Sequence, residues 1–186
     1  MTYKGAPMMS VDQTWATPPS VVKWLSQYLN IKYDLDAAAS NQTAKAPLWF
    51  TEKDDALSQE WFGNVWLNPP FGLGGKLQRQ FIAKAIEECK QGRARSVTCL
   101  IPARTDTKLF HDLIVPNARK IYFVNGRINF EKQGLDNVGA NATFPSMVVL
   151  FRRPRVYDPA KKRTRQRIGY QMRTLDMPQA IRRGKL

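Results

Sequence analysis

Residues 65–71 read Val-Trp-Leu-Asn-Pro-Pro-Phe, an apolar run that stops at two consecutive prolines and an aromatic residue. The apolar part is typical of a buried strand. Proline lacks a backbone N–H and fixes φ at about −65°, so Pro69 and Pro70 end the strand in a rigid turn and exclude a helix interior. The motif therefore holds Asn68, the Pro69 carbonyl and the ring of Phe71 close together at a strand end.

This turn suits the recognition of a planar base that carries an amino group. The carboxamide oxygen of Asn68 and the carbonyl of Pro69 can accept the two hydrogens of an exocyclic NH2 group, while Phe71 offers a ring for stacking. Asn-Pro-Pro also occurs in ordinary loops, so a motif this short is a hypothesis until its context agrees with it.

The composition predicts one domain with a core of its own. The chain has 186 residues, of which 43% are hydrophobic. Met1 to Ser10 contain no apolar run of signal-peptide length, and no stretch is long enough to span a membrane. We therefore expect a protein without membrane association, in the cytoplasm.

The cysteine and histidine content predicts no metal site. Two cysteines in a chain of this length are typical of a reducing compartment. Cys89, Cys99 and the single histidine, His111, lack the spacing of zinc ligands. We interpret the cysteines as small core residues and His111 as an ordinary helix residue.

The positive charge is concentrated near the C-terminus. Of 29 Lys and Arg residues, 12 lie after residue 151, where Asp158 and Asp176 are the only acidic residues. This segment carries a net charge of +10 out of +14 for the chain. A basic tail on a nearly balanced domain predicts a polyanionic partner such as nucleic acid, the alternative being a solvated tail without a role. We therefore predict a domain at 1–151 and a basic C-terminal tail at 152–186.

Helices and strands alternate along the chain. Helical spacing of apolar residues predicts helices over 21–29, 77–89 and 105–115. Strands are predicted over 33–36, 65–67, 96–101, 121–124, 128–130 and 147–151, with a long loop over 131–145. Such alternation indicates an α/β fold whose parallel sheet is covered on both faces.

Several polar residues follow predicted strands, where parallel sheets bind their ligands. Asp36, the pair Asp54 and Asp55, and Asn68 lie at or near such ends and are expected to share one cleft. Asp36 is equally consistent with a turn cap, and Asp54 or Asp55 with a helix N-cap.

An ordered set of four motifs resembles the DNA N6-adenine methyltransferases of bacteriophages and prophages. A late element, Gly126-Arg127-Ile128-Asn129-Phe130, is also similar to that family, and the resemblance runs from Trp15 to Phe151. The four motifs are Trp15-Ala16-Thr17-Pro18, Leu35-Asp36-Ala37-Ala38-Ala39, Asp54-Asp55-Ala56-Leu57 and Asn68-Pro69-Pro70-Phe71.

The resemblance implies a Rossmann-like, three-layer α/β sheet, mostly parallel with an antiparallel C-terminal edge. It implies S-adenosylmethionine as cofactor, double-stranded DNA as partner, and methyl transfer to the amino group of a flipped adenine. It also implies a bacterial or phage-infected host cell and a link to restriction-modification, with protection and regulation both open as roles.

The resemblance also assigns the site residues. The cofactor would be held by Trp15, Thr17 and Pro18 at its methionine end, by Asp36 and Ala37 after the first strand, and by Asp55, or less favourably Asp54, at its adenine amino group, with Asn68 alongside. The catalytic residues would be Asn68 and Pro69 on the target amino group, Pro70 in the same turn, and Phe71 stacked on the target base.

The chain departs from the family pattern after the first strand. Ala37-Ala38-Ala39 stands where a glycine-rich turn is usual, and alanine does not readily adopt positive φ. The short spacing from Asp36 to Asn68 further predicts that the middle of the sheet is reduced.

Two other functions remain open from the sequence. One is a methyltransferase acting on RNA or on a protein glutamine amide, since such enzymes use a similar turn but generally keep the glycine-rich one. The other is a non-catalytic DNA-binding protein. The chain has no evident large recognition domain, so we expect a short or loosely read target site.

Overall fold

The computed structural model describes residues 15–132, 139–141, 144–153 and 171–184. Short strands and helices alternate along these ranges. They are β1 (Trp15–Ala16), α1 (Pro19–Leu29), β2 (Leu35–Asp36), β3 (Leu48–Trp49), the 3₁₀ turn η1 (Glu52–Asp54), β4 (Gly63–Leu67), the 3₁₀ turn η2 (Leu73–Gly75), α2 (Lys76–Lys90), β5 (Ala94–Pro102), the π-helical segment η3 (Leu109–Ile114), α3 (Val115–Asn117), β6 (Lys120–Val124), β7 (Asn129–Lys132), β8 (Gly139–Asn141), β9 (Ser146–Arg152), β10 (Gln171–Leu175) and α4 (Gln179–Arg182).

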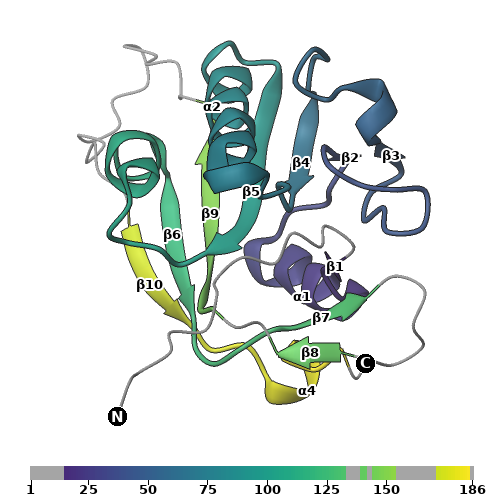
Figure 1. The fold of residues 1–186 in the computed structure, drawn as a ribbon, viewed down its shortest axis with the longest axis vertical. Coiled ribbons are helices and arrows are strands. Elements are labelled where there is room, and N and C mark those ends of the chain that lie inside the picture. The colour runs from purple at the N-terminus through teal and green to yellow at the C-terminus, as the bar shows by residue number, and fades with distance from the viewer. Residues whose placement is uncertain (1–14, 133–138, 142–143, 154–170, 185–186) are drawn as a thin grey trace, which may run out of the picture.

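A mixed seven-stranded sheet forms the centre of the molecule (Figure 1). Its strand order is β10-β6-β9-β5-β4-β2-β3. All neighbouring pairs are parallel except those made by β9, which runs antiparallel to both β5 and β6. The predicted α/β fold with a mostly parallel sheet is confirmed.

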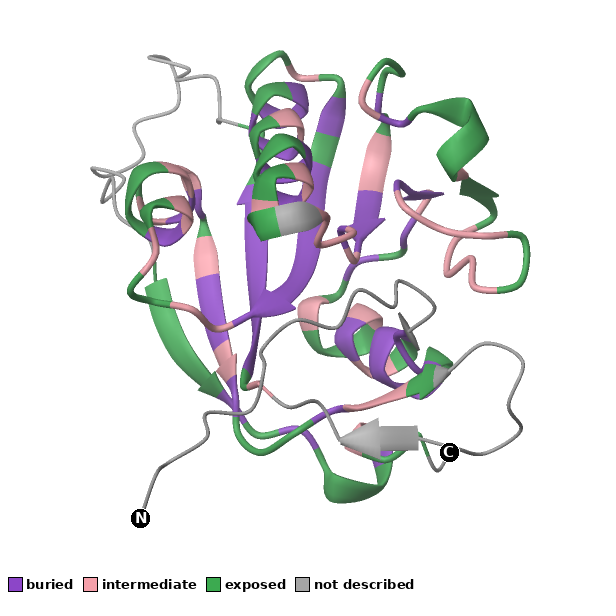
Figure 2. Ribbon diagram, viewed as in Figure 1, coloured by how far each residue is buried: buried purple, intermediate pink, exposed green. Residues whose placement is uncertain are grey.

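The sheet is buried on both faces at its centre (Figure 2). Alternate residues of each strand enter opposite cores, because successive side chains of a strand point to opposite faces. In β4, Val65 and Leu67 join a core covered by α2 and η3, whereas Trp66 joins a core covered by α1. The molecule therefore has the three layers that the sequence predicts.

The two long helices follow the sequence pattern closely. Val21, Val22 and Leu25 give α1 one buried face, and its chain leaves through Asn30 in the left-handed conformation. On α2 the buried face runs from Phe81 to Cys89, and Gly92, with φ at 78°, follows the helix end as a left-handed glycine.

A buried ion pair fixes α2 against the sheet. The Glu88 carboxylate is fully buried and contacts Arg93 Nε at 2.6 Å and Lys84 Nζ at 2.7 Å. It also accepts a hydrogen bond from the backbone of Trp61, just before β4. Burial alone would raise the pKa of Glu88, but the bonds to Arg93, Lys84 and Trp61 outweigh it and lower that pKa.

A second, three-stranded sheet has the order β1-β7-β8. It lies beside the ends of the main parallel strands at the bottom of Figure 1. Its strands pair antiparallel, with Ala16 opposite Glu131. β7 overlaps the strand predicted at 128–130, and β8 lies within the segment predicted to be a loop.

The place of the antiparallel strand differs from the prediction. β9, the predicted strand at 147–151, lies inside the sheet between β5 and β6 and not at its edge. The edge is formed by β10, which is parallel to β6. β9 can occupy the interior because its first six residues are all buried.

Residues 171–184 belong to the fold, which differs from the predicted boundary at residue 151. The backbone of β10 pairs with all five residues of β6, while Leu175, Met177 and Ile181 join the core beneath α1. Ser20 of α1 donates a hydrogen bond to the carbonyl of Ile181. Four of the five residues in β10 are exposed, so their apolar pattern is too weak to show a strand in the sequence. Of the rest of the predicted tail, Arg152 ends β9 and Arg153 follows it, whereas residues 154–170 and 185–186 lie outside the described residues.

The helix predicted at 105–115 begins four residues later. Residues 105–107 form a turn instead, in which the Thr107 hydroxyl bonds the carbonyl of Arg104. The backbone N–H of Phe110 then bonds Thr107, and helical structure runs from Leu109 to Asn117.

We expect Leu175→Ala to destabilise the protein by about 2–5 kcal/mol, because it removes a fully buried side chain from the core beneath α1. Met172→Ala, three residues earlier on the same strand, removes a side chain that is 47% exposed and should change stability by less than about 0.5 kcal/mol. Urea unfolding measures both. Equal stabilities of the two variants would contradict the place of β10 in the fold.

Candidate active site

Four of the predicted site residues, Asp36, Asp54, Asp55 and Asn68, lie at or after the carboxyl ends of three adjacent parallel strands. Asp36, the last residue of β2, pairs with Trp66 of β4 and with Trp49 of β3. Asn68 therefore follows β4 directly beside the turn that follows β2. Between Asp36 and β4 the chain forms only the two-residue β3 and the turn η1, and β3 lies at the edge of the sheet and not in its middle.

The Asn68-Pro69 turn carries free hydrogen-bonding groups. Asn68 is half-buried and Pro69 is buried. Within the described ranges, neither the Asn68 carboxamide nor the Pro69 carbonyl has a hydrogen-bond partner. The two acceptors that the sequence places here are therefore available to a ligand.

The Phe71 ring is half-buried in a small aromatic and cationic cluster. The ring of Phe144, from the segment before β9, lies 5.9 Å away between centroids at an interplanar angle of 49°. The guanidinium of Arg104, just after β5, lies 5.7 Å from the Phe71 centroid. A fourth strand end thereby joins the site.

Asp36 is turned into the protein and shapes the alanine-rich turn. Its side chain is 2% exposed, and its two oxygens accept hydrogen bonds from the backbone N–H groups of Ala38 at 3.3 Å and Lys45 at 2.9 Å. Burial raises the pKa of Asp36 from 3.8 to about 6, against the opposing effect of these bonds. The turn-cap interpretation of Asp36 is thus realised.

The two aspartates after β3 differ from each other. Asp54 is exposed and accepts hydrogen bonds from the Thr51 hydroxyl and backbone, which lower its pKa. This is the helix-capping role that the sequence left open. Asp55 is exposed, has a left-handed φ of 47°, and has a carboxylate without a hydrogen bond to any described residue.

The Thr17-Pro18 motif lies at the start of α1, next to the small sheet. Thr17 is 2% exposed, and its hydroxyl has no hydrogen-bond partner among the residues described.

Burial lowers the pKa of Lys45, while the charges of Glu131 and Asp36 raise it. The small sheet, which contains Glu131, therefore lies within electrostatic reach of the turn after β2. The side chain of Trp15 is outside the described part of the structure, although its backbone pairs in β1.

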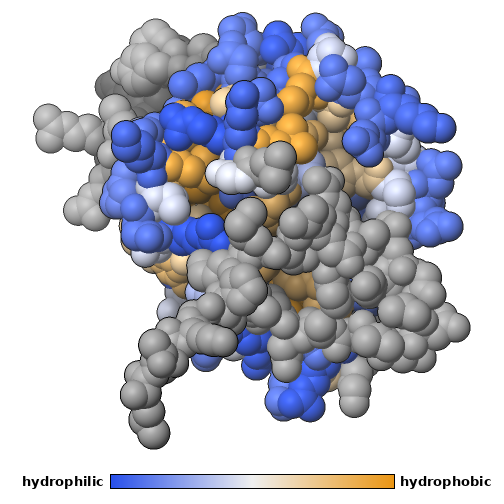
Figure 3. Space-filling model, viewed as in Figure 1, coloured by the Kyte–Doolittle hydropathy of each residue, from blue (hydrophilic) through white to orange (hydrophobic). Residues whose placement is uncertain are grey.

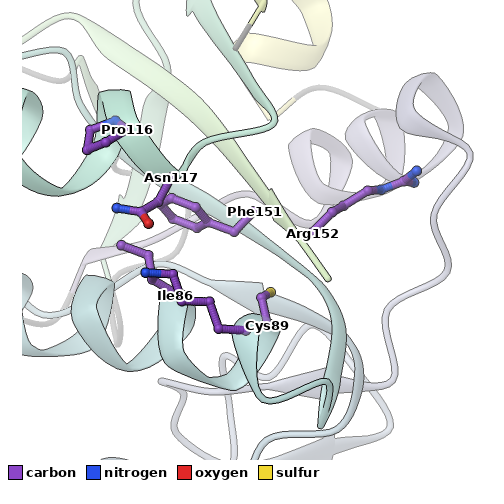
Figure 4. A pocket seen from close by; sticks show the side chains of 7 residues that line it. Ile86, Cys89, Pro116, Asn117, Phe151 and Arg152 are labelled. Atoms are coloured by element: carbon purple, nitrogen blue, oxygen red, sulfur yellow. The ribbon is translucent and has the colours of Figure 1, made fainter. Parts of the chain in front are cut away.

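Two cavities differ in their relation to these motifs. An open cavity of about 420 Å³ lies between α1 and the segment 44–47 and is lined by Pro19, Tyr33 and Lys45, next to the turn that Asp36 holds. A smaller one, of about 210 Å³, lies between the end of α2, α3 and the last residues of β9 (Figure 4). There the Phe151 ring faces Asn117 and Ile86.

Hydrophilic side chains dominate the upper part of the face drawn in Figure 3, with apolar ones between them. The described residues include no helix long and apolar enough to cross a membrane. The same residues contain no group of three His, Cys, Asp or Glu side chains placed to hold a metal ion. Cys89 and Cys99 are free and buried, as predicted, and His111 lies in the helical segment η3.

A family model of DNA N-6-adenine-methyltransferase (Dam) matches residues 6–172 of the chain. The chain belongs to this family. Membership makes it a DNA adenine N6-methyltransferase that depends on S-adenosylmethionine. Both the predicted activity and the predicted cofactor are confirmed at this level.

Individual relatives agree with the family match. The chain is 32% identical to a DNA N-6-adenine-methyltransferase of Haemophilus phage HP1 over 153 residues, which cover 81% of this chain and 85% of the relative. It is 30% identical to the protein of the same name from Escherichia phage T1 over 135 residues, covering 71% of this chain and 53% of that one. The chain thus spans about half the length of the T1 relative.

A solved structure shows the same fold. It is described as a class I S-adenosylmethionine-dependent methyltransferase from Listeria monocytogenes, with a TM-score of 0.52 and 11% sequence identity. The similarity covers 90% of this chain and 67% of that one. The fold prediction is confirmed by this likeness.

Sequence reasoning missed two residues of the cluster around Phe71. Arg104 follows a strand that was correctly predicted to stop at Pro102, so the strand-end rule was sufficient to find it. Phe144 had no comparable signal, because its contact with Phe71 joins residues far apart in the chain.

We expect the stability of the protein, compared with Asp36→Asn, to fall by about 3 kcal/mol between about pH 4 and about pH 7 in the absence of ligand. The folded protein holds the Asp36 proton more tightly than the unfolded chain does. The contribution is therefore complete below the unfolded pKa of 3.8 and is lost as the pH rises through about 6.

Urea unfolding across this range measures the difference, with the exposed Asp106→Asn as control. A constant difference between wild type and Asp36→Asn would contradict the burial of this carboxyl group.

Proposed function

We propose that this chain methylates an adenine that has left the DNA double helix, with Asn68 and the Pro69 carbonyl holding its amino group. The observation that carries this proposal is the pair of acceptors at the end of β4, neither of which has a hydrogen-bond partner among the described residues. Among hydrogen-bonding groups of a base, an exocyclic NH2 matches two adjacent acceptors, because it has two hydrogens to donate.

The two acceptors would also activate the nucleophile. The amino nitrogen of adenine is weakly nucleophilic, since its lone pair is delocalised into the ring. Hydrogen bonds to Asn68 and Pro69 favour a more tetrahedral nitrogen and free that lone pair. Pro69 and Pro70 hold both acceptors in place beforehand, and such preorganisation of position and dipoles accounts for large rate enhancements.

The cofactor would lie across the strand ends next to this turn. Bound S-adenosylmethionine supplies an electrophilic methyl group. Its fit to the site is supported by two side chains that have no hydrogen-bond partner among the described residues. These are the Asp55 carboxylate, which can accept from an amino group, and the buried Thr17 hydroxyl.

We propose the remaining contacts from the family resemblance. Trp15, Pro18 and Ala37 complete the cofactor site, and Asp36 contributes mainly by holding the turn that starts at Ala37. Asp54 is the weaker candidate for the adenine amino group, because its carboxylate already bonds Thr51.

Phe71 would offset part of the free energy needed to extract the base. Flipping a paired base requires a few kcal/mol. Stacking of a base on an aromatic ring contributes about 1–3 kcal/mol. The Phe71 ring, half-buried and supported by Phe144, is placed for this role beside Asn68.

Double-stranded DNA in a bacterial cytoplasm is the substrate we propose, in keeping with the phage origin of the relatives. The basic segment 152–186 would bind the DNA backbone non-specifically, because neutralising phosphates releases counterions and strengthens binding. The domain itself would then read a short target sequence.

We expect Asn68→Ala to lower the rate of methyl transfer by at least about 100-fold while leaving the dissociation constant of S-adenosylmethionine unchanged. The variant loses one acceptor for the target amino group. Methyl transfer to plasmid DNA, followed by nucleoside analysis, and calorimetry with the cofactor are the measurements. Asn68→Asp, which keeps an acceptor, should be milder.

Asn125→Ala is the matched control for Asn68→Ala, because Asn125 is exposed at the end of β6. Full activity of Asn68→Ala, or loss of its cofactor binding, would contradict the assignment. Methylation found on RNA or protein in place of DNA adenine by the wild type would contradict the proposed substrate.

We expect Phe71→Leu to lower turnover on duplex DNA, with part of the loss restored when the target adenine is mismatched. A mismatched base needs less free energy to leave the helix, so it depends less on stacking. Phe62→Leu, at an exposed position just before β4, is the control. Equal losses on paired and mismatched substrates would indicate that Phe71 does not assist flipping.

A further inference from the structure

Arg104 combines a fixed position with a positive charge that has no partner in the described structure. Its backbone N–H bonds the carbonyl of Pro102 at 2.9 Å, and its own carbonyl accepts from the Thr107 hydroxyl at 3.0 Å. The preceding residue, Ala103, bonds Pro145 across the start of β9. The backbone of Arg104 is thus held on both sides at the carboxyl end of β5.

The guanidinium of Arg104 makes neither an ion pair nor a side-chain hydrogen bond with any residue in the described ranges. Its Nε is buried and lacks a partner. A buried donor without a partner is unfavourable by about 1–3 kcal/mol. The Arg104 guanidinium therefore has five N–H donors and a full positive charge without an acceptor among the described residues.

The Phe71 ring orients this guanidinium. With Cζ at 5.7 Å from the ring centroid, Arg104 has the geometry of a cation–π contact. Phe144 supports the same ring from the segment before β9. A guanidinium held in this way loses less conformational freedom when it binds, which favours a planar, two-pronged acceptor such as a phosphate or a carboxylate.

Two anions would bind at this end of the sheet, a DNA phosphate and the methionine carboxylate of the cofactor. The strand order indicates which of them lies closer to Arg104. β5, which Arg104 follows by two residues, lies on one side of β4. β2 and β3, which lead to the proposed cofactor residues Asp36 and Asp55, lie on its other side. Arg104 is therefore on the side of the target base, against Phe71, and away from the residues proposed to hold the cofactor.

We propose that Arg104 binds a backbone phosphate of the DNA strand being methylated, next to the target adenine. This positioning contact would hold the flipped nucleotide so that its base reaches Phe71 and Asn68. The proposal rests on the function proposed above and adds a phosphate-binding residue to the site.

The test combines a charge-removing variant with a charge-removing substrate. Arg104→Gln is compared with wild type and with Arg95→Gln, which removes the same charge from an exposed position at the opposite end of β5. Each protein binds a duplex that carries a neutral methylphosphonate at one phosphate beside the target adenine. A series of duplexes moves that substitution one position at a time.

We expect Arg104→Gln to weaken DNA binding by about 10- to 100-fold and to reduce the slope of affinity against salt by about one. One methylphosphonate position should weaken binding by wild type and by Arg95→Gln but not further by Arg104→Gln. The dissociation constant of S-adenosylmethionine should stay the same. Arg104→Lys should retain part of the affinity, because it keeps the charge without the planar fork.

Three results would overturn the proposal. These are unchanged DNA affinity of Arg104→Gln, an equal methylphosphonate penalty in all three proteins, and a loss confined to cofactor binding, which would assign Arg104 to the methionine carboxylate. If Arg104→Gln does not fold, Arg104→Met, which also removes the charge and keeps an unbranched side chain, takes its place in the same comparison. Because these measurements concern binding, a failure of wild-type methyl transfer is seen separately and bears on the proposed function alone.

Discussion

The position of the site depends on where the hydrogen-bonded strand β4 ends. β4 lies between β2 and β5, and its last three residues are fully buried, so neither face can shift without exposing the core. Pro69 and Pro70 then remove the donors that a longer strand would need. Because the buried residues before Asn68 and the prolines after it both fix where β4 ends, Asn68 has a single position relative to its neighbours. Hydrogen-bond acceptors that must fit a single amino group require this kind of rigidity.

The parallel arrangement of the strands places residues from several strand ends next to Asn68. Parallel strands have their carboxyl ends at the same end of the sheet. Strands β2, β3, β4 and β5 therefore place four residues at that end, namely Asp36, Asp55, Asn68 and Arg104. The internal antiparallel strand β9 contributes from its opposite end, which places Phe144 against Phe71. Residues from almost the whole chain therefore meet at this edge, although few are close in sequence.

The alanine-rich turn illustrates how this chain replaces the usual glycines. No residue from Ala37 to Ala39 has positive φ, so alanine suits their conformation. The Asp36 carboxylate bonds backbone N–H groups at both ends of the segment from Ala38 to Lys45 and so stabilises a turn without left-handed residues near its start. This arrangement buries the Asp36 carboxylate, and the burial raises its pKa.

The sequence alone determined the features that rest on local pattern. The apolar periods of α1 and α2, the buried runs of β4 and β5, and the prolines that end them were all visible, because each depends on neighbouring residues. Only the tertiary structure decided the interior place of β9, the edge strand β10, the capping role of Asp36 and the contact between Arg104 and Phe71. The places of β9 and β10 and the Arg104–Phe71 contact depend on pairs of residues distant in the chain, and the exposed residues of β10 carry little apolar signal. Asp36 bonds residues nearby in the chain, but only its burial in the fold shows that it caps the turn. Short-range patterns specify the elements, whereas the packing of one element on another specifies which side chains meet.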